Sequence, residues 1–281
     1  AGTAATVDKS GTTATAVNRA SAASTAGYWT PERIAAAKPV VAPKLTPAAA
    51  PVAEPQGTPR FVHATEPTGA HTTASEWITN GRLFFTNPGV GDFVCSANVV
   101  SSNNHDVLAT ARHCVADPGA GKVYQNFRFA PAYNRGNAPY GWWTWRSAGW
   151  RVDDLGPGGD NAFIVLNRGG NANLHVQDAV GGSGIGFNWA SNNYAHAIGL
   201  PASVDYAVWC EGQPYDGPSG GVQIRNCNGL SGGASGGSFI VNYQADGSAV
   251  QTASYFGSWG DAYWAYYRDV AWQVYNGAQN A

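Results

Sequence analysis

The sequence predicts an all-β fold for most of the chain. From about residue 76 onward, short apolar runs alternate with segments rich in Gly, Asn and Pro, the pattern of antiparallel sandwiches and barrels. Eleven tryptophans and thirteen tyrosines, against only 12% charged residues, are typical of a robust extracellular β protein. At 281 residues and 44% hydrophobic content, the chain is long enough to bury the core of one large domain or two small ones.

The first part of the chain differs in composition. Alanine, threonine and proline dominate residues 1–60, where Tyr28 and Trp29 are the only aromatic residues. This composition predicts an irregular N-terminal segment and not a packed domain. We expect residues 1–75 to be a propeptide-like segment or a disordered tail, alternatives that composition does not separate, and residues 76–281 to form the folded domain.

One short helix is expected inside the N-terminal segment. Thr30 can cap it, Pro31 suits the first helical position, and Glu32 lies in the first turn. Pro39 would prevent the helix from continuing.

The apolar runs of residues 76–281 are each expected to form a strand. In the first half they cover residues 81–85, 92–100, 107–110, 127–129, 141–145 and 162–166. In the second half they cover residues 194–198, 205–210, 222–224, 238–243 and 250–256. Near the end, Val270 and Val274 lie four residues apart behind Asp269, which predicts a terminal helix packed on the β structure.

A serine held among glycines precedes the apolar run 238–243, in the stretch Gly233-Ala-Ser-Gly-Gly237. The glycines remove β-carbons that would block a substrate carbonyl, and they permit the sharp backbone that aims the amides of Gly233 and Ser235 at one point. Such a pair of donors is an oxyanion hole, and Ser235 is the candidate nucleophile. Ser231 lies in a similar glycine pattern, but only Ser235 is followed at once by a strand, so we favour Ser235.

A serine hydroxyl is a weak nucleophile and needs a histidine base that a carboxylate orients. His113 follows the buried run 107–110 and adjoins a cysteine, and Asp160 precedes the run 162–166. The other candidates lack such positions, and we expect structural or solvated roles for them: His105, His175, His196, Asp153 and Asp154.

The order His113, Asp160, Ser235 is the order found in chymotrypsin. Thr110-Ala-Arg-His-Cys114 resembles the Thr-Ala-Ala-His-Cys box of that family, Asp160-Asn-Ala162 its Asp-x-Ala box, and the stretch around Ser235 its Gly-x-Ser-Gly-Gly box. The chain resembles secreted serine endopeptidases of the trypsin/chymotrypsin fold, within them the bacterial glutamyl-endopeptidase-like, actinobacterial branch. This resemblance implies two six-stranded antiparallel barrels with the active site between them and a C-terminal helix.

The resemblance also implies a mechanism. Ser235 would attack the scissile carbonyl of a peptide, His113 would accept its proton, and Asp160 would fix the imidazole. The amides of Gly233 and Ser235 would stabilise the oxyanion, and no metal or organic cofactor is required.

Four cysteines, an even number without zinc-site spacing, are typical of disulfides formed in an oxidising compartment. Four cysteines allow three pairings. The family resemblance implies Cys95 with Cys114 and Cys210 with Cys227, which would stabilise the segments beside His113 and before Ser235.

Specificity is only partly predicted. Trypsin-like members have an aspartate six residues before the nucleophile, where this chain has Gly229, so cleavage after Arg or Lys is not supported. Glu-specific relatives place a histidine on the strand expected at residues 250–257, which has none. Arg225 would bind an acidic side chain only if it points inward, and we expect it to be exposed.

By analogy, Ser231, Ser254 and Tyr255 should line the specificity pocket and favour aromatic or small uncharged side chains. Arg112 departs from the small residue that the family has before its histidine, and we expect it to affect the rim of the site.

Composition excludes some partners. The net charge of −2, without basic clusters, argues against nucleic acid and anionic membranes. No apolar stretch of about 20 residues is present, and the absence of methionine indicates that the chain begins after processing. We expect a soluble, secreted monomer whose partners are protein or peptide substrates and its own propeptide or a secreted protease inhibitor.

A different function remains open. Trp142, Trp143, Trp145 and Trp150 would suit a secreted carbohydrate-binding module with stacking aromatic side chains. A pseudoprotease that keeps the fold as a binder is a third possibility, which the intact set of His113, Asp160 and Ser235 disfavours.

Overall fold

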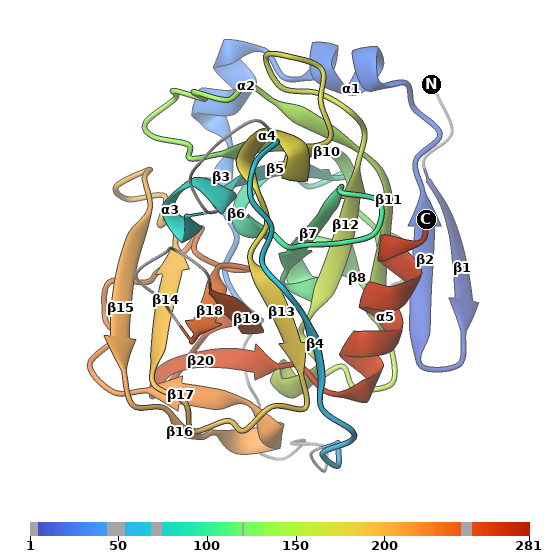
Figure 1. Cartoon of the computed structure of the whole chain (residues 1–281). Coiled ribbons are helices and arrows are strands. Elements are labelled where there is room, and N and C mark those ends of the chain that lie inside the picture. Colours follow the sequence, from blue (N-terminus) through green and yellow to red (C-terminus); the bar gives the residue numbers. More distant parts are fainter. Residues whose placement is uncertain (1–4, 44–53, 69–74, 120, 243–248) are drawn as a thin grey trace.

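The computed structural model describes residues 5–43, 54–68, 75–119, 121–242 and 249–281. Two β sheets lie side by side, with a few short helices around them (Figure 1). The first sheet contains most of the strands before residue 167, and the second contains the named strands after it together with β4 (Arg60–Val62). The expected all-β class is therefore confirmed.

The first sheet closes into a six-stranded barrel. Its strands are β5 (Asn80–Asn87), β6 (Gly91–Val99), β7 (Val107–Thr110), β10 (Gln125–Pro131), β11 (Trp143–Arg151) and β12 (Ala162–Leu166). They pair in the order β11-β10-β5-β6-β7-β12, and β12 pairs back onto β11, which completes the barrel. Leu83, Phe85, Phe129 and Trp145 are among the buried side chains of its interior.

The second sheet is open within the described residues, so it is a half-barrel and not the closed second barrel that the family resemblance implies. Its order is β15 (Val208–Gly212), β14 (Ala195–Gly199), β18 (Ser238–Val241), β19 (Val250–Trp259), β20 (Asp261–Tyr266), β17 (Val222–Ile224) and β16 (Tyr215–Asp216). Residue 243, at the end of the expected strand 238–243, lies outside the described residues.

A disulfide bridges the two ends of this open sheet. Cys210 lies in β15 at one edge, and Cys227 follows β17 near the other edge. The second disulfide joins Cys95 in β6 to Cys114. The expected pairing is confirmed, and the covalent bond between Cys210 and Cys227 links edges that no strand ladder joins among the described residues.

The expectation of an irregular N-terminal segment is wrong. β1 (Thr6–Ser10) and β2 (Thr13–Val17) form a hairpin, and β2 extends the first sheet along β11. Ala14 and Ala16 point inward and are buried, whereas the intervening residues are more exposed. Alternating alanine and threonine carry too little hydrophobic contrast to predict a strand, yet they satisfy the free backbone groups of an edge strand.

The rest of the segment continues along both sheets. It forms α1 (Ala22–Tyr28), α2 (Pro31–Ala36), β3 (Lys38–Pro39), parallel to β6, and β4 (Arg60–Val62), which pairs with β13 (Gly184–Phe187). The helix expected after Thr30 is confirmed, since the Thr30 side chain accepts a hydrogen bond from the Arg33 amide. Three further helical or paired pieces are small: α3 (Glu76–Thr79), α4 (Val176–Val180) and the pair β8 (Ala116–Asp117) with β9 (Lys122–Val123).

The expected terminal helix is α5 (Asp269–Gln279), which packs against the first sheet with Val270 and Val274 buried (Figure 1). Its Tyr275 ring contacts the Phe163 ring of β12 at 5.6 Å between centroids. No helix in the described part of the chain has the length and apolar character needed to cross a membrane.

Three of the four tryptophans that suggested a carbohydrate-binding module belong to the core, and the fourth, Trp142, is half-buried with the Arg128 guanidinium 4.0 Å above its ring. Trp143, Trp145 and Trp150 are each about 1% exposed, inside or against the first barrel. A stacking platform requires exposed rings, so the burial of three of the four rings weighs against this alternative.

Candidate active site

His113 lies at the end of a buried strand of the first barrel. β7 ends at Thr110, and the chain then makes a single 3-10 turn, Arg112–Cys114. The disulfide from Cys114 to Cys95 attaches this turn to β6. The apolar strand and the covalent bond together determine where the imidazole lies.

Asp160 holds His113 with two hydrogen bonds. The imidazole Nδ1 lies 2.6 Å from Asp160 Oδ2, and the backbone amide of His113 donates to Oδ1 at 2.9 Å. The aspartate is only 2% exposed. Because its two oxygens accept from the ring and from the backbone of the same residue, Asp160 fixes both the position and the orientation of the imidazole.

Burial alone would raise the pKa of Asp160, since it disfavours the charged carboxylate. The charge and hydrogen bonds of His113, together with the charge of Arg112, outweigh burial and hold this pKa below its ordinary value. Asp160 is therefore ionised at neutral pH and can stabilise a positively charged imidazole.

Arg112 points away from the rim of the site, and its role was not apparent from the sequence. Its guanidinium is buried and donates to the carbonyl of Gly159 at 2.8 Å and of Gly156 at 3.2 Å, and also to the Asp154 carbonyl. These acceptors belong to the loop that leads into Asp160. Arg112 thus supports the carboxylate that orients its neighbour in sequence.

Ser235 lies where the second sheet meets the first. Its carbonyl accepts a hydrogen bond from the Ser96 amide of β6 at 2.7 Å, and the residue is 3% exposed. Gly236 has φ +83°, and a Cβ there would collide with Thr110 Oγ1 and the Ser96 carbonyl. The glycine after the serine is therefore required for the loop to approach the strand that leads to His113.

The ring atom that would accept the serine proton is available. His113 Nε2 is buried and has no hydrogen-bond partner among the described residues, and no hydrogen bond joins it to Ser235 Oγ there. Hydrogen bonds of this kind are often long without substrate and shorten in the complex. The structure therefore brings His113 and Asp160 into contact and places the Ser235 loop beside them.

The peptides around Gly233 are oriented as an oxyanion hole requires. The carbonyl of Gly232 accepts from the Ala202 amide at 2.9 Å, and the carbonyl of Ala234 accepts from the Gly237 amide at 2.9 Å. In a trans peptide the N–H points opposite to the C=O, so the amides of Gly233 and Ser235 point away from these contacts. Neither amide has a hydrogen-bond partner among the described residues.

The three residues expected to line the specificity pocket differ in exposure. Ser231 is exposed, in the turn that precedes Gly233. Ser254 is fully buried, and its hydroxyl lies 2.5 Å from the hydroxyl of Tyr267. Tyr255 is buried against Trp264 in the core of the second sheet. A specificity role for these residues stays a prediction.

The competing histidines and aspartates have partners elsewhere. His105 pairs with Asp178, His175 with Asp106, and His196 with Glu211, each within 2.9 Å. Asp153 pairs with Arg151, and Asp154 accepts from the Gly156 amide. The Phe256 ring, which the sequence did not single out, packs edge-on against the His113 ring at 5.6 Å between centroids.

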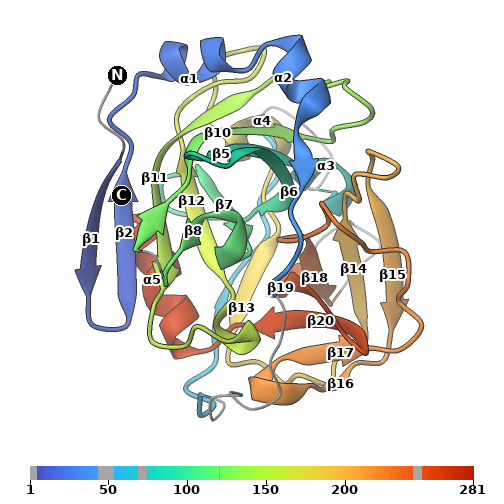
Figure 2. The same cartoon turned by 180° about the vertical axis from the view of Figure 1, so that it is seen from behind.

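Residues 38–42 of the N-terminal segment run between the two sheets, from beside β6 toward β19 (Figure 2). The Val40 amide donates to the Val94 carbonyl of β6 at 3.2 Å. A Cβ on Gly232 would lie 3.2 Å from Pro39, and a Cβ on Gly257 in β19 would lie 2.8 Å from Ala42. The segment therefore passes from the first sheet, past the turn before Gly233, to the second sheet.

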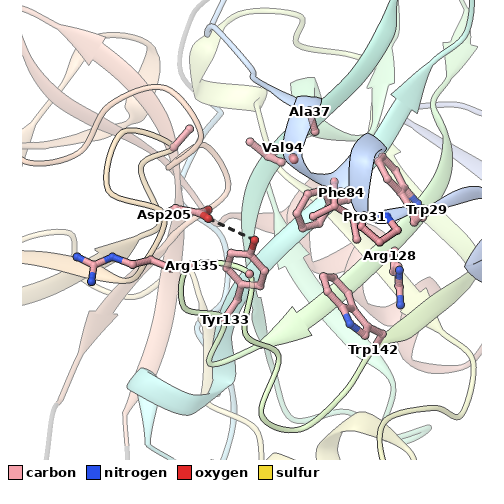
Figure 3. Close-up of a pocket in the computed structure, with 14 residues that line it drawn as sticks. Trp29, Pro31, Ala37, Phe84, Val94, Arg128, Tyr133, Arg135, Trp142 and Asp205 are labelled. Carbon is pink, nitrogen blue, oxygen red and sulfur yellow. Dashed lines mark hydrogen bonds between the residues drawn. The ribbon is translucent and has the colours of Figure 1, made fainter.

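A cavity of about 670 Å³ lies beside this crossing, between the α1–α2 region and the first barrel (Figure 3). Trp29, Phe84, Tyr133 and Trp142 supply aromatic walls, and the Trp29 indole donates to the Asn126 carbonyl at 2.7 Å. The buried Trp29 ring therefore anchors the N-terminal segment to the barrel just before residues 38–42.

Comparisons with known proteins agree with this geometry. No family model and no curated protein matches the chain. Among solved structures, the thermostable serine protease AL20 from an extremophilic microorganism is 31% identical, with 72% of this chain and 97% of that one covered and a TM-score of 0.66. The chain belongs to the chymotrypsin-like serine proteases.

Two further structures resemble this serine protease. The protease Anisep from Arthrobacter nicotinovorans is 29% identical over 78% of this chain and 100% of that one, with a TM-score of 0.65. A Glu endopeptidase is 12% identical over 76% of this chain and 99% of that one, with a TM-score of 0.57. At 12% identity the second likeness shows the fold alone, so the glutamyl branch does not follow from it.

We predict that Asp160→Asn lowers kcat by roughly 10⁴-fold while the protein stays folded, because the amide no longer holds the imidazole in its reactive tautomer. Steady-state kinetics on a peptide substrate, with circular dichroism to establish folding, measure this effect. Asp153→Asn, which removes a carboxylate in the same loop that does not contact His113, is the control and should retain activity.

The same variant should show how acid affects stability. Because the pKa of Asp160 is lowered in the fold, its contribution to the free energy of unfolding is fully present above the ordinary value of 3.8 and is lost as pH falls through the lower folded-state pKa. Wild type should therefore lose its advantage over Asp160→Asn on acidification, as measured by denaturant unfolding at several pH values. A stability difference that does not change with pH would contradict this assignment.

Proposed function

We propose that this protein is a secreted serine endopeptidase that hydrolyses peptide bonds through Ser235, His113 and Asp160. The observation that carries the proposal is the buried His113–Asp160 pair beside a serine loop that presents two free amides. Two disulfides support an oxidising, extracellular setting.

The reaction follows from the geometry. Ser235 Oγ attacks the scissile carbonyl and transfers its proton to His113 Nε2, and the amides of Gly233 and Ser235 stabilise the negatively charged oxygen of the tetrahedral intermediate. His113 then gives the proton to the leaving amine, which leaves an acyl-enzyme. Water hydrolyses this ester by the same proton transfers, and Asp160 stabilises the charged imidazole in both halves.

For specificity, we favour substrates with an uncharged residue before the cleaved bond. Arg225 is exposed, and its guanidinium stacks on the Tyr215 ring at 4.5 Å, so it does not serve as a buried receptor for an acidic side chain. Residues 250–257 contain no histidine, and Gly229 carries no charge. A library of peptides that vary only at this residue measures the preference.

The test of the mechanism is covalent labelling with a fluorophosphonate followed by peptide mapping. We predict that the label is found on Ser235 and that Ser235→Ala abolishes both labelling and hydrolysis. Ser231→Ala is the matched control, because it removes a neighbouring hydroxyl and should still be labelled. Labelling of Ser231, or full activity in Ser235→Ala, would refute the assignment.

We further propose that the N-terminal segment restrains the site as part of the same chain. Residues 38–42 cross from β6 to β19 beside Gly232, at the start of the loop that carries Ser235, and this position supports the proposal that they limit the access of an extended substrate. Val40 is half-buried against the first barrel, which gives the crossing an apolar anchor. Its release by cleavage would open the site, as expected of a propeptide.

Val40→Asp should raise the rate of fluorophosphonate labelling of the full-length chain by roughly tenfold. Replacing the half-buried Val40 side chain with Asp removes apolar burial and places a carboxylate against the barrel, which together cost about 1.5 kcal/mol, and about 1.4 kcal/mol corresponds to a factor of ten. Val41→Asp is the matched control, because Val41 lies in the same segment with its side chain 82% exposed. Equal labelling rates in wild type and both variants would show that the segment does not restrain the site.

A further inference from the structure

We propose that Arg82 is a positioning residue that holds the oxyanion loop, residues 232–235, in its reactive shape. The proposal rests on the function proposed above, since it concerns the two amides of that loop. Arg82 does not contact Ser235 or His113 through any hydrogen bond in the described residues.

Arg82 is a fully buried cation in the middle of β5. Its side chain has no exposed surface, although its neighbours Leu83 and Phe84 are apolar core residues. Removing a guanidinium from water costs several kcal/mol unless hydrogen bonds and an opposite charge offset that cost. Only 12% of the residues in this chain are charged, so a buried charge at this position indicates a specific structural or functional role.

The guanidinium first organises the turn of residues 200–205 in the second half of the chain. It donates to the Leu200 carbonyl, to the Pro201 carbonyl at 3.4 Å and to Asp205 Oδ1 at 2.9 Å. Tyr133 donates to the other oxygen of Asp205 at 3.3 Å. Burial lowers the pKa of Arg82, and the charge of Asp205 acts against this shift.

The turn of residues 200–205 also supports the first peptide of the oxyanion loop. The Ala202 amide donates to the Gly232 carbonyl at 2.9 Å, and this contact sets the direction of the Gly233 N–H. Arg82 therefore acts on the first oxyanion donor through Ala202.

Arg82 also binds the loop directly. Its Nη1 donates to the Gly233 carbonyl at 3.2 Å, and the Ser96 hydroxyl donates to the same oxygen at 2.9 Å. This carbonyl belongs to the peptide between the two donor peptides, and Gly233 has the left-handed φ of +94°. One guanidinium thus fixes the middle of the loop and, through Ala202, its beginning.

The contacts of Arg82 with the oxyanion loop should matter most in the transition state. Oxyanion donors stabilise the reacting oxygen only when they lie about 2.7–3.1 Å from its transition-state position. A loop that loses its supports can still bind substrate in the ground state, because substrate side chains and backbone contact other surfaces. Loss of Arg82 should therefore lower kcat and leave KM nearly unchanged.

The experiment compares Arg82→Met, Arg82→Lys and Asp205→Asn in the full-length chain, matched for N-terminal processing by intact mass. We expect Arg82→Met to lower kcat by roughly 10- to 100-fold, less than the 10²–10³ of a lost donor, with KM within about twofold. The affinity for a peptide boronate, which needs the same amides, should fall by the same factor as kcat. Arg82→Lys should recover part of both, since an ammonium keeps the charge but not the planar fork.

Arg146→Met is the matched control. Arg146 is also an arginine of the first barrel that pairs with an aspartate, Asp106, but it is only partly buried and makes no contact with the oxyanion loop. It should lower the melting temperature without changing kcat or boronate affinity. Asp205→Asn keeps the three contacts of Arg82 with backbone carbonyls, so it serves as the milder variant if Arg82→Met does not fold. We expect it to lower kcat and boronate affinity by a smaller factor than Arg82→Met.

The outcomes separate the two proposals. Absence of hydrolysis and of Ser235 labelling in wild type would overturn the proposed function itself. An active wild type, with Arg82→Lys and Asp205→Asn matching it in kcat and boronate affinity, would overturn the role of Arg82. A rise in KM at constant kcat would assign Arg82 to substrate binding and would overturn the positioning role.

Discussion

The hydrogen bond from the Ser96 amide to the Ser235 carbonyl joins the nucleophile loop of the second sheet to β6 of the first. The site depends on this junction, because His113 and Asp160 belong to one sheet and Ser235 to the other. The Ser96 hydroxyl accepts from the Leu200 amide and donates to the Gly233 carbonyl, so one serine connects three segments. Gly236 permits the close approach that these bonds need.

Two buried arginines stabilise the loops that meet there. Arg112 binds the carbonyls of the loop before Asp160, and Arg82 binds the loop before Ser235. In both cases a guanidinium with several donors replaces regular secondary structure as the partner of backbone carbonyls. The amides of the oxyanion loop must stay unpaired, so this loop cannot pair with a neighbouring strand. Side-chain donors hold its carbonyls instead.

Much of the protease fold could be predicted from the sequence, because buried strands such as Val107–Thr110 and Ala162–Leu166 are continuous apolar runs between turn residues. The candidate catalytic residues could also be proposed from the sequence, because a nucleophilic serine needs glycines around it and a histidine base needs a carboxylate partner. β1 and β2 were missed because alternating Ala and Thr stabilise a strand only when an edge such as β11 is present to pair with. The roles of Arg82 and Arg112 were not accessible, because their acceptors are backbone carbonyls that carry no sequence signal.

The open second sheet and the crossing of residues 38–42 likewise depend on tertiary contacts, so they could not be predicted from the sequence. The disulfide was expected from the family resemblance, but no local pattern indicates that it takes the place of a ladder between the edges of the second sheet, or that the Val40 amide donates to the Val94 carbonyl. Under the proposed function, the N-terminal segment would restrain a site in which Ser235, His113 and two amides act on an acyl group. Restraint by the segment and catalysis by the loop would then both depend on the same junction between the sheets.

The most direct measurement is a crystal structure of the protein with a peptide boronate. The account predicts a covalent bond from boron to Ser235 Oγ, one boronate oxygen within hydrogen-bond distance of the Gly233 and Ser235 amides, and residues 38–42 displaced from Gly232 and Gly257. A boronate bound to another serine, or bound to Ser235 with neither amide in contact, would contradict it.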